Sequence, residues 1–233
     1  MSININYSNK TSDGSTDNLV LFSDEKFKIN APKKFLLDAE YSYINDLLKN
    51  CDLKKNLFVF EMSSKKKIVL ISIKKNLKTS DIENLGAEFF GRINYGKNSE
   101  YKITSDSIQG KYENFLGHFL HGLKLKSYDF KKYKTKKDSR HISIIITGTK
   151  NKPSAKTQEK FKALEEGTFF ARDLVSEPGN VLHPDEYAKR ISSLKKDGLK
   201  INVYDEKKLK KLGMHALLGV GQGSVRGSYL VTM

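Results

Sequence analysis

The sequence predicts an α/β protein in which strands and helices alternate along the chain. Apolar residues are nearly continuous at 68–73 and 141–147, which is typical of strands buried on both faces of a sheet. Between these runs, residues 115–125 carry apolar side chains at helical spacing. A further helical pattern without proline extends from 155 to 175 and ends before Pro178. We therefore expect a sheet covered by helices, followed by a long helix.

The first part of the chain is predicted element by element from these patterns. Strands are expected, in order, at 18–22, 57–60, 68–73, 101–103 and 141–147. Helices are expected at 35–48, from Ser80 to about Phe90, and at 115–125. Ser80 with Glu83 fits a capping box at the start of the second of these helices.

Beyond the long helix, shorter elements follow. Pro184 is suited to the first turn of a helix that ends at Gly198. A strand is expected at 200–204, then a short helix that Asp205 caps and Gly213 ends, and a last strand at 229–232.

Composition excludes several classes of protein. No apolar run is long enough to span a membrane and no targeting signal is recognisable, so we expect a cytoplasmic protein without a membrane partner. The single cysteine, Cys51, cannot form an internal disulfide, which agrees with a reducing compartment, and nothing indicates a reactive thiol.

The net charge of +15 raises the possibility of nucleic-acid binding. Only five of the 42 basic residues are arginine, however, and arginine is the residue suited to base and phosphate recognition. The lysines are scattered, with short runs at 65–67 and within 131–137. The charge therefore favours weak, salt-sensitive and non-specific binding over a specific site.

Three histidines are candidates for a functional role. His118 and His121 have a spacing that can bind a metal on a helix, but no third ligand lies near them in the sequence, so we expect a helix face with partly exposed histidines. His183, before Pro184, is interpreted as a helix-start residue rather than a base.

A glycine-rich segment and an aromatic segment have structural interpretations too. The segment 219–224 lacks the GxGxxG and Walker spacings and the GxSxG elbow, and predicts a tight turn. Tyr128, Phe130 and Tyr133 could stack on bases, but their spacing favours packing at one edge of the first domain.

Four stretches together resemble the leucyl aminopeptidase family. The order and spacing of these stretches carry the resemblance. The stretches are Leu125–Thr135 (LKSYDFKKYKT), Arg172–Asn180 (RDLVSEPGN), His183-Pro184 with Tyr187-Ala188, and Gly213–Ser224. Ser176 stands where the family usually has Asn. The resemblance implies an N-terminal α/β domain similar to a macro domain at 1–152, a connecting helix at 153–178, and an incomplete N-terminal part of the metallopeptidase catalytic domain at 179–233.

Complete members of the family are hexamers that use two divalent metals, commonly Zn or Mn, to remove N-terminal residues from peptide substrates. The metal ligands lie in a Lys-x-x-x-x-Asp segment and an Asn-Thr-Asp-Ala-Glu-Gly-Arg segment, and we expect neither in residues 1–233. We therefore assign no catalytic, cofactor-binding or metal residue, and expect the chain to be truncated before the metal-binding motifs and inactive alone.

Two other functions stay open. The chain could be a basic DNA-binding or scaffold fragment, which binding to duplex DNA across a salt series would distinguish. A macro-like nucleotide-binding module ranks last, because residues 1–150 contain no glycine-rich phosphate loop.

Overall fold

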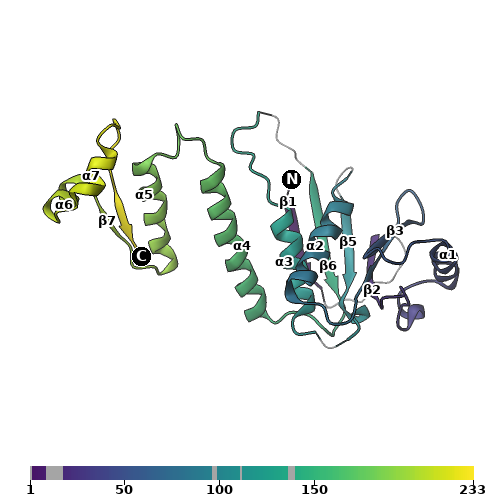
Figure 1. Cartoon of the computed structure of the whole chain (residues 1–233). Coiled ribbons are helices and arrows are strands. Elements are labelled where there is room, and N and C mark those ends of the chain that lie inside the picture. The colour runs from purple at the N-terminus through teal and green to yellow at the C-terminus, as the bar shows by residue number, and fades with distance from the viewer. Residues whose placement is uncertain (1, 9–17, 96–98, 111, 136–139) are drawn as a thin grey trace. The chain divides into compact units, whose positions relative to one another are not determined.

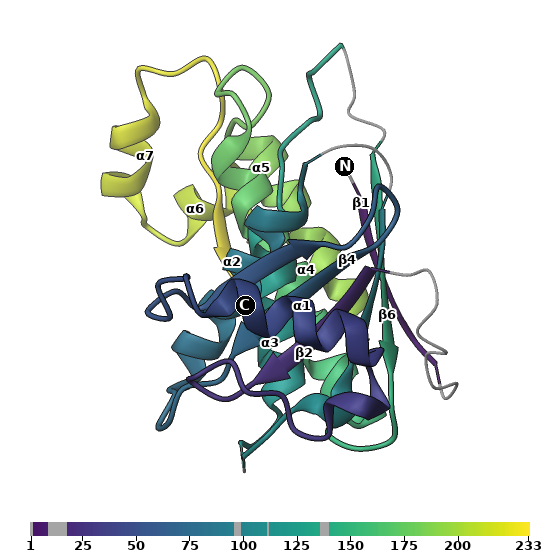
Figure 2. The ribbon, with the colours of Figure 1, turned by 90° about the vertical axis from the view of Figure 1, so that its right-hand side faces the viewer.

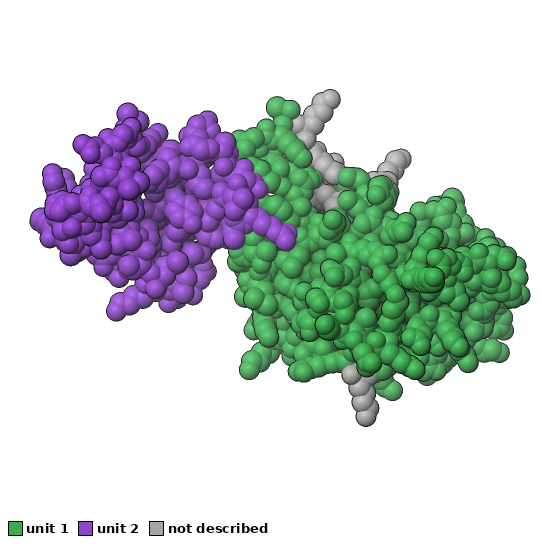
Figure 3. Space-filling view, in the orientation of Figure 1, with its two compact units in different colours: residues 1–169 green, residues 170–233 purple. Residues whose placement is uncertain are grey.

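The computed structural model describes residues 2–8, 18–95, 99–110, 112–135 and 140–233 (Figure 1). Lys136 and Lys137, the end of one predicted lysine run, lie outside these residues. The chain forms two compact units, residues 1–169 and residues 170–233, which Figure 3 distinguishes by colour. None of the helices built from the described residues is both long and apolar enough to cross a bilayer.

Unit 1 is built on a six-stranded sheet, which confirms the predicted α/β class. The strand order is β1-β6-β5-β2-β4-β3, and all neighbours are parallel except β3 and β4. The strands are β1 (Ser2–Tyr7), β2 (Asn18–Ser23), β3 (Leu57–Glu61), β4 (Lys67–Ser72), β5 (Ser99–Thr104) and β6 (His141–Thr147).

The edge strand β1 was not predicted from the sequence. It pairs in parallel with β6, and it turns Ile3 and Ile5 toward the core while Asn4 stays exposed. The predicted burial of β4 on both faces is confirmed, but the same prediction for β6 is wrong. Ser143 and Ile145 of β6 are only partly buried, on the same side of the sheet as Asn4.

Helices α2 (Thr79–Ile93) and α3 (Phe115–Lys126) cover one face of the sheet, and α1 (Asp38–Leu48) covers part of the other. In Figure 2, α1 lies in front of the strands and α2 and α3 lie behind them. Two separate apolar cores result. The core beneath α2 and α3 includes Phe22, Phe89 and Phe119, and the core beneath α1 includes Leu21 and Ile44.

Two predicted helix starts differ from the structure. The helix expected from residue 35 begins at Asp38, after a short 3₁₀ helix at Pro32–Lys34, and Leu37 before it is 67% exposed. The second helix begins at Thr79, where the backbone N–H of Lys78 donates to Asp81 at 2.9 Å, so the Ser80–Glu83 capping box is wrong.

Helices α2 and α3 touch backbone to backbone. A Cβ at Gly86 in α2 would collide with the backbone carbonyl of Phe119, and a Cβ at Gly122 in α3 would collide with the backbone of Glu83. Only glycine permits this approach, because any side chain would push the helices apart.

The long predicted helix is present as α4 (Ala155–Ser176). Its buried residue is Phe161, whose ring packs edge-on against His118 at 4.9 Å and tilted against His121 at 5.1 Å between ring centres. A Cβ at Gly117 would approach the Phe161 ring to 2.5 Å, so that glycine makes room for the ring. The first part of α4 is thereby fixed to α3.

Unit 2 contains a short 3₁₀ helix (Ser193–Asp197), three short α-helices and a two-stranded antiparallel sheet. The α-helices are α5 (Pro184–Ser192), α6 (Glu206–Lys211) and α7 (His215–Gly221). The strands are β7 (Asn202–Tyr204) and β8 (Leu230–Thr232). Pro184 begins α5 as predicted, and the Asp205 side chain caps α6 by accepting from the backbone N–H of Lys208. Val220 remains 87% exposed.

An ion pair connects the segment after α4 to α5 within unit 2. The carboxylate of Glu177, whose side chain is 1% exposed, accepts a hydrogen bond of 2.8 Å from the Arg190 guanidinium. Arg190 also donates to Glu186 at 3.0 Å, and the hydrogen bonds to these two carboxylates raise the pKa of Arg190. Arg190 therefore compensates a buried charge.

We expect Gly86→Ala to lower the free energy of unfolding by about 2–3 kcal/mol, because the added methyl group overpacks the α2–α3 contact. Urea denaturation monitored by circular dichroism measures this change. Gly91→Ala in the same helix is the matched control, since nothing lies within 4 Å of its Cβ position. It should stabilise the protein by about 0.5–1 kcal/mol through helix propensity. Equal effects of the two substitutions would contradict the close backbone contact.

We expect Arg190→Met to destabilise unit 2 by about 2 kcal/mol, because Glu177 loses a charge-assisted hydrogen bond in a buried position. Faster amide hydrogen exchange in α5 would report the loss. The control is Lys189→Met, whose exposed amino group lies 3.9 Å from Glu186. Its effect should stay below about 0.5 kcal/mol, as for surface ion pairs in general. An Arg190→Met protein that exchanges like the control would contradict the structural role of this pair.

Candidate functional site

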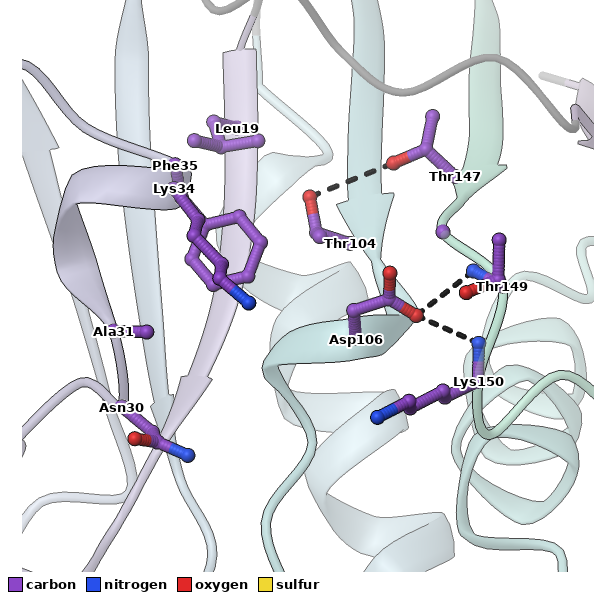
Figure 4. A pocket seen from close by; sticks show the side chains of 11 residues that line it. Leu19, Asn30, Ala31, Lys34, Phe35, Thr104, Asp106, Thr147, Thr149 and Lys150 are labelled. Atoms are coloured by element: carbon purple, nitrogen blue, oxygen red, sulfur yellow. Dashed lines mark hydrogen bonds between the residues drawn. The ribbon is translucent and has the colours of Figure 1, made fainter.

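The carboxyl ends of β5 and β6 border a cavity of about 390 Å³ in unit 1 (Figure 4). One wall follows β5 and β6, and the opposite wall is the segment that follows β2. The residues that line the cavity are Leu19, Asn30, Ala31, Lys34, Phe35, Thr104, Asp106, Thr147, Gly148, Thr149 and Lys150.

The topology of the sheet explains why a cavity forms here. The chain leaves β2 toward α1 on one face, and it leaves β5 toward α3 on the other face. β2 and β5 are parallel neighbours, so the two connections diverge between their carboxyl ends. Open α/β sheets bind ligands at such a switch point, in the crevice outside the carboxyl ends of the strands.

Hydrogen bonds fix the wall that follows β5 and β6. One carboxylate oxygen of Asp106, Oδ1, accepts from the backbone N–H groups of Thr149 at 2.8 Å and Lys150 at 2.7 Å. The Ser105 hydroxyl donates to the Thr147 carbonyl at 2.8 Å. Gly148 has a φ of 101°, and a Cβ there would lie 2.6 Å from Ser105 Oγ. Only glycine therefore fits where the two loops cross.

The floor of the cavity is formed by Thr104 and Thr147, the last residues of β5 and β6. Both are buried, and their hydroxyl oxygens lie 3.5 Å apart. The Thr147 hydroxyl also donates to the carbonyl of Ile103 at 3.4 Å. Two hydroxyl groups at the bottom of a cavity with a carboxylate beside them can orient a polar ligand.

The opposite wall carries an aromatic ring and a cation. Phe35 is half-buried and packs against the core beneath α1, while Lys34 is exposed. Ala31 has a φ of 49°, a left-handed conformation uncommon for a residue with a Cβ. Figure 4 shows Lys34 and Phe35 projecting from this wall toward the space that Lys150 enters from the other side.

The structure places the two helix histidines in separate pairs. Nδ1 of His118 lies 3.1 Å from Oε1 of Glu83, and Nδ1 of His121 lies 3.2 Å from Oε1 of Glu165. Both histidines were expected to be partly exposed, but His121 is buried. Both rings pack on Phe161, so their role is to hold α4.

The other candidates also have structural roles. His183 is the N-cap residue of α5, and its ring contacts the Asp185 carboxylate, which agrees with a helix-start residue. The Cys51 thiol donates to the carbonyl of Leu47 at 3.3 Å. The ring of Tyr128 packs against Phe169 with 5.3 Å between centres, as expected for packing rather than base stacking.

The glycine-rich segment is only partly the turn that its sequence predicts. Gly219 and Gly221 belong to α7, and the turn follows them at 222–226. A Cβ at Gly221 would collide with the Ser228 hydroxyl, so one glycine does permit a close approach. Nothing lies within 4 Å of the Cβ positions of Gly219 and Gly223.

The bare Lys-x-x-x-x-Asp spacing occurs three times in the chain, at Lys33–Asp38, Lys124–Asp129 and Lys200–Asp205, so the expectation that it is missing was wrong. The three pairs lie in unrelated places and do not form one site. Lys33 makes an exposed ion pair with Asp38 at 3.9 Å. Lys124 donates to the carbonyl of Ile3 at 2.7 Å, and burial lowers its pKa. Asp205 caps α6.

A divalent metal pair needs several carboxylate or imidazole ligands that converge. Among the residues that the structure describes, no group of three or more His, Cys, Asp or Glu side chains is arranged to hold a metal ion.

The sequence is similar to those of cytosol aminopeptidases. A family model described as "Cytosol aminopeptidase family, catalytic domain" matches residues 169–233. The probable cytosol aminopeptidase of Nitrobacter winogradskyi is 34% identical over 176 residues, which cover 72% of this chain and 35% of that protein. The probable cytosol aminopeptidase of Brucella anthropi is 39% identical over 180 residues, with the same coverage of 72% and 35%.

Solved structures share the fold. A mutant of tomato leucine aminopeptidase superposes with a TM-score of 0.74 at 18% identity, covering 99% of this chain and 50% of the tomato chain. The bottromycin maturation enzyme BotP, solved in complex with Mn, superposes with a TM-score of 0.69 at 17% identity, covering 93% of this chain and 44% of BotP. The chain spans about a third of the length of the curated relatives it matches. From its sequence motifs, its relatives and its fold, the chain belongs to the cytosol (leucyl) aminopeptidase family.

Proposed function

We propose that residues 1–233 supply the N-terminal domain and the opening of the catalytic domain of a metal-dependent aminopeptidase that removes N-terminal residues from peptides in the cytoplasm. The observation that carries this proposal is the match of residues 169–233 to the catalytic-domain model, together with relatives named cytosol aminopeptidase. We place the N-terminal domain at 1–152, the connecting helix at 153–178 and the first part of the catalytic domain at 179–233.

The metals, when bound, polarise the scissile carbonyl and activate a water molecule. Because the described residues contain no convergent ligand set, we propose that the ligands come from a segment outside residues 1–233. The role of this chain is then structural. The Glu177–Arg190 pair anchors the entry into the catalytic domain, and His183 and Pro184 begin its first helix.

The buried and exposed surfaces of unit 2 support this role. Its two-stranded sheet and three short helices bury few apolar side chains, namely Ala188, Ile191, Ile201 and Leu209. An apolar pocket remains open beside α5 and β8, lined in part by Tyr187, Ile191 and Val231. A layer of this kind is stable when further strands or helices cover it.

A chimera tests the proposal directly. Residues 1–233 replace the matched N-terminal portion of the Brucella anthropi relative, and release of leucine from a leucyl anilide is measured with Mn²⁺ or Zn²⁺. We expect metal-dependent activity from the chimera, and none from residues 1–233 alone, because only the chimera contains a complete ligand set.

A second chimera controls for misfolding by transplanting only residues 179–233, the part that we assign to the catalytic domain. Metal-dependent leucine release by purified residues 1–233 alone would contradict the assignment of the ligands to another segment. If both chimeras fold, as judged by circular dichroism, yet neither is active while the parent enzyme is, then the proposed function is wrong.

A further inference from the structure

A second cavity lies beside the edge strand β1, bordered by β1, α3 and the first part of α4. All its residues belong to unit 1, and none of them lines the cavity at the carboxyl ends of β5 and β6. Its volume of about 470 Å³ is within the range of small-molecule sites. The proposed peptide hydrolysis assigns no role to its residues.

Part of the lining is apolar and held in place. Leu120 of α3 is buried, and the ring of Phe161 in α4 packs against the two histidine rings of α3. Ile5 of β1 and Phe169 of α4 add further apolar surface to the same cavity. Such a surface is suited to the apolar side chain of a small ligand, because contact with it removes that side chain from water.

A cation and a hydroxyl group lie on the side of β1. The half-buried Lys124 ammonium donates to the carbonyl of Ile3 at 2.7 Å, and burial lowers the pKa of Lys124. Burial, with a smaller contribution from Glu165, raises the pKa of Tyr7 to about 12. The Tyr7 hydroxyl makes no hydrogen bond to any residue that the structure describes. This hydroxyl and the remaining ammonium hydrogens of Lys124 can therefore donate to a ligand carboxylate.

A carboxylate lies near this cation without pairing with it. The charge of Glu165 raises the pKa values of Lys124 and Tyr7, so Glu165 is close to both. Its Oε1 is held 3.2 Å from Nδ1 of His121, and its side chain is 16% exposed. Within the described part of the chain, no ion pair joins Glu165 to Lys124, whose amino group is held by the carbonyl of Ile3. Two opposite charges in a partly buried place thus lack direct neutralisation, which a ligand with both charges would supply.

The two other charged residues of the lining contribute less. Lys162 and Glu166 are exposed side chains of α4 that lie 3.9 Å apart, one turn from each other. Water screens an exposed pair of this kind, and the two charges cancel. Selectivity for a ligand therefore rests on the inner groups.

We propose that this cavity binds a free α-amino acid with an apolar side chain. Its carboxylate lies against Lys124 and Tyr7, its ammonium group against Glu165, and its side chain against Leu120 and Phe161. Both charges of an α-amino acid are bonded to one carbon, which matches two protein charges that lie close together but unpaired. A peptide separates its terminal charges and fits less well. Amino acids are also what the proposed peptidase would release, so control by product would rest on that function, whereas the binding itself does not.

Calorimetric titration of residues 1–233 with L-leucine tests the proposal. We expect saturable one-to-one binding with a Kd below about 1 mM. Two analogues separate the charges, since 4-methylpentanoate lacks only the ammonium group of leucine and 3-methylbutylamine lacks only its carboxylate. Each should bind at least about tenfold more weakly, because each leaves one protein charge without its partner. Glycine should also bind at least about tenfold more weakly, because it lacks the apolar side chain.

Substitutions locate the binding in this cavity. Glu165→Gln keeps a hydrogen-bonding group beside His121 but removes the charge, and should weaken leucine binding about tenfold. Tyr7→Phe removes a hydroxyl without a partner among the described residues, so it should fold normally and weaken binding about threefold. The matched control is Glu159→Gln, an exposed position of α4 outside the lining. It should change the Kd less than about twofold, as exposed charges do.

Several results would overturn the proposal. One is a lack of saturable leucine binding to the unsubstituted chain, and another is equally tight binding of either analogue. Unchanged leucine affinity in Glu165→Gln would do so as well. If circular dichroism shows that Glu165→Gln does not fold, Tyr7→Phe decides, and unchanged affinity in that variant contradicts the site. None of these results bears on the proposed peptidase role, which the chimeras test.

Discussion

The direct backbone contact between α2 and α3 is the constraint on which unit 1 depends. Gly86 and Gly122 let the two helices approach until each backbone touches the other. This approach sets the position of α3 over the sheet, where Phe119 packs against Phe22 with 5.3 Å between ring centres. The opposite side of α3 then presents a fixed surface to α4, through Gly117 and its two histidines.

The same arrangement determines where a ligand can bind. Because α3 lies on one face and α1 on the other, the connections after β2 and β5 separate and leave a crevice between them. The crossing of Gly148 over Ser105 stiffens one side of this crevice.

Local sequence patterns predicted most elements, and they failed where distant residues decide the outcome. The apolar run of β4 and the helical spacing of α3 are local signals, and both elements were predicted nearly to their bounds. β1 was missed because its Ser and Asn residues give a weak strand signal, and it forms only by pairing with β6, far along the chain. The burial of β6 was overestimated because Asn4 lies beside it and the apolar core beneath α1 includes no residue of β6.

The candidate site could not be predicted for a related reason. Its residues come from the ends of β5 and β6, from the loops that follow them, and from β2 and the segment 30–35 after it. None of the segments around Lys34, Asp106 and Lys150 resembles a known binding motif. The signal that could have indicated it is positional, since Asp106 lies two residues after β5 and Gly148 comes directly after β6, and both strands are parallel to their neighbours. Recognising that signal requires the strand order, which the sequence alone does not provide.

Native-state hydrogen exchange tests the central role of the α2–α3 contact most directly. If this contact holds unit 1 together, the amides of Phe89, Phe119 and Leu123 exchange only through global unfolding of the unit. The amides of the edge strands β1 and β3, and of β7 and β8 in unit 2, should exchange through smaller openings at lower free energy. Exchange of the α2 and α3 amides at a lower free energy than those of the edge strands would contradict this account.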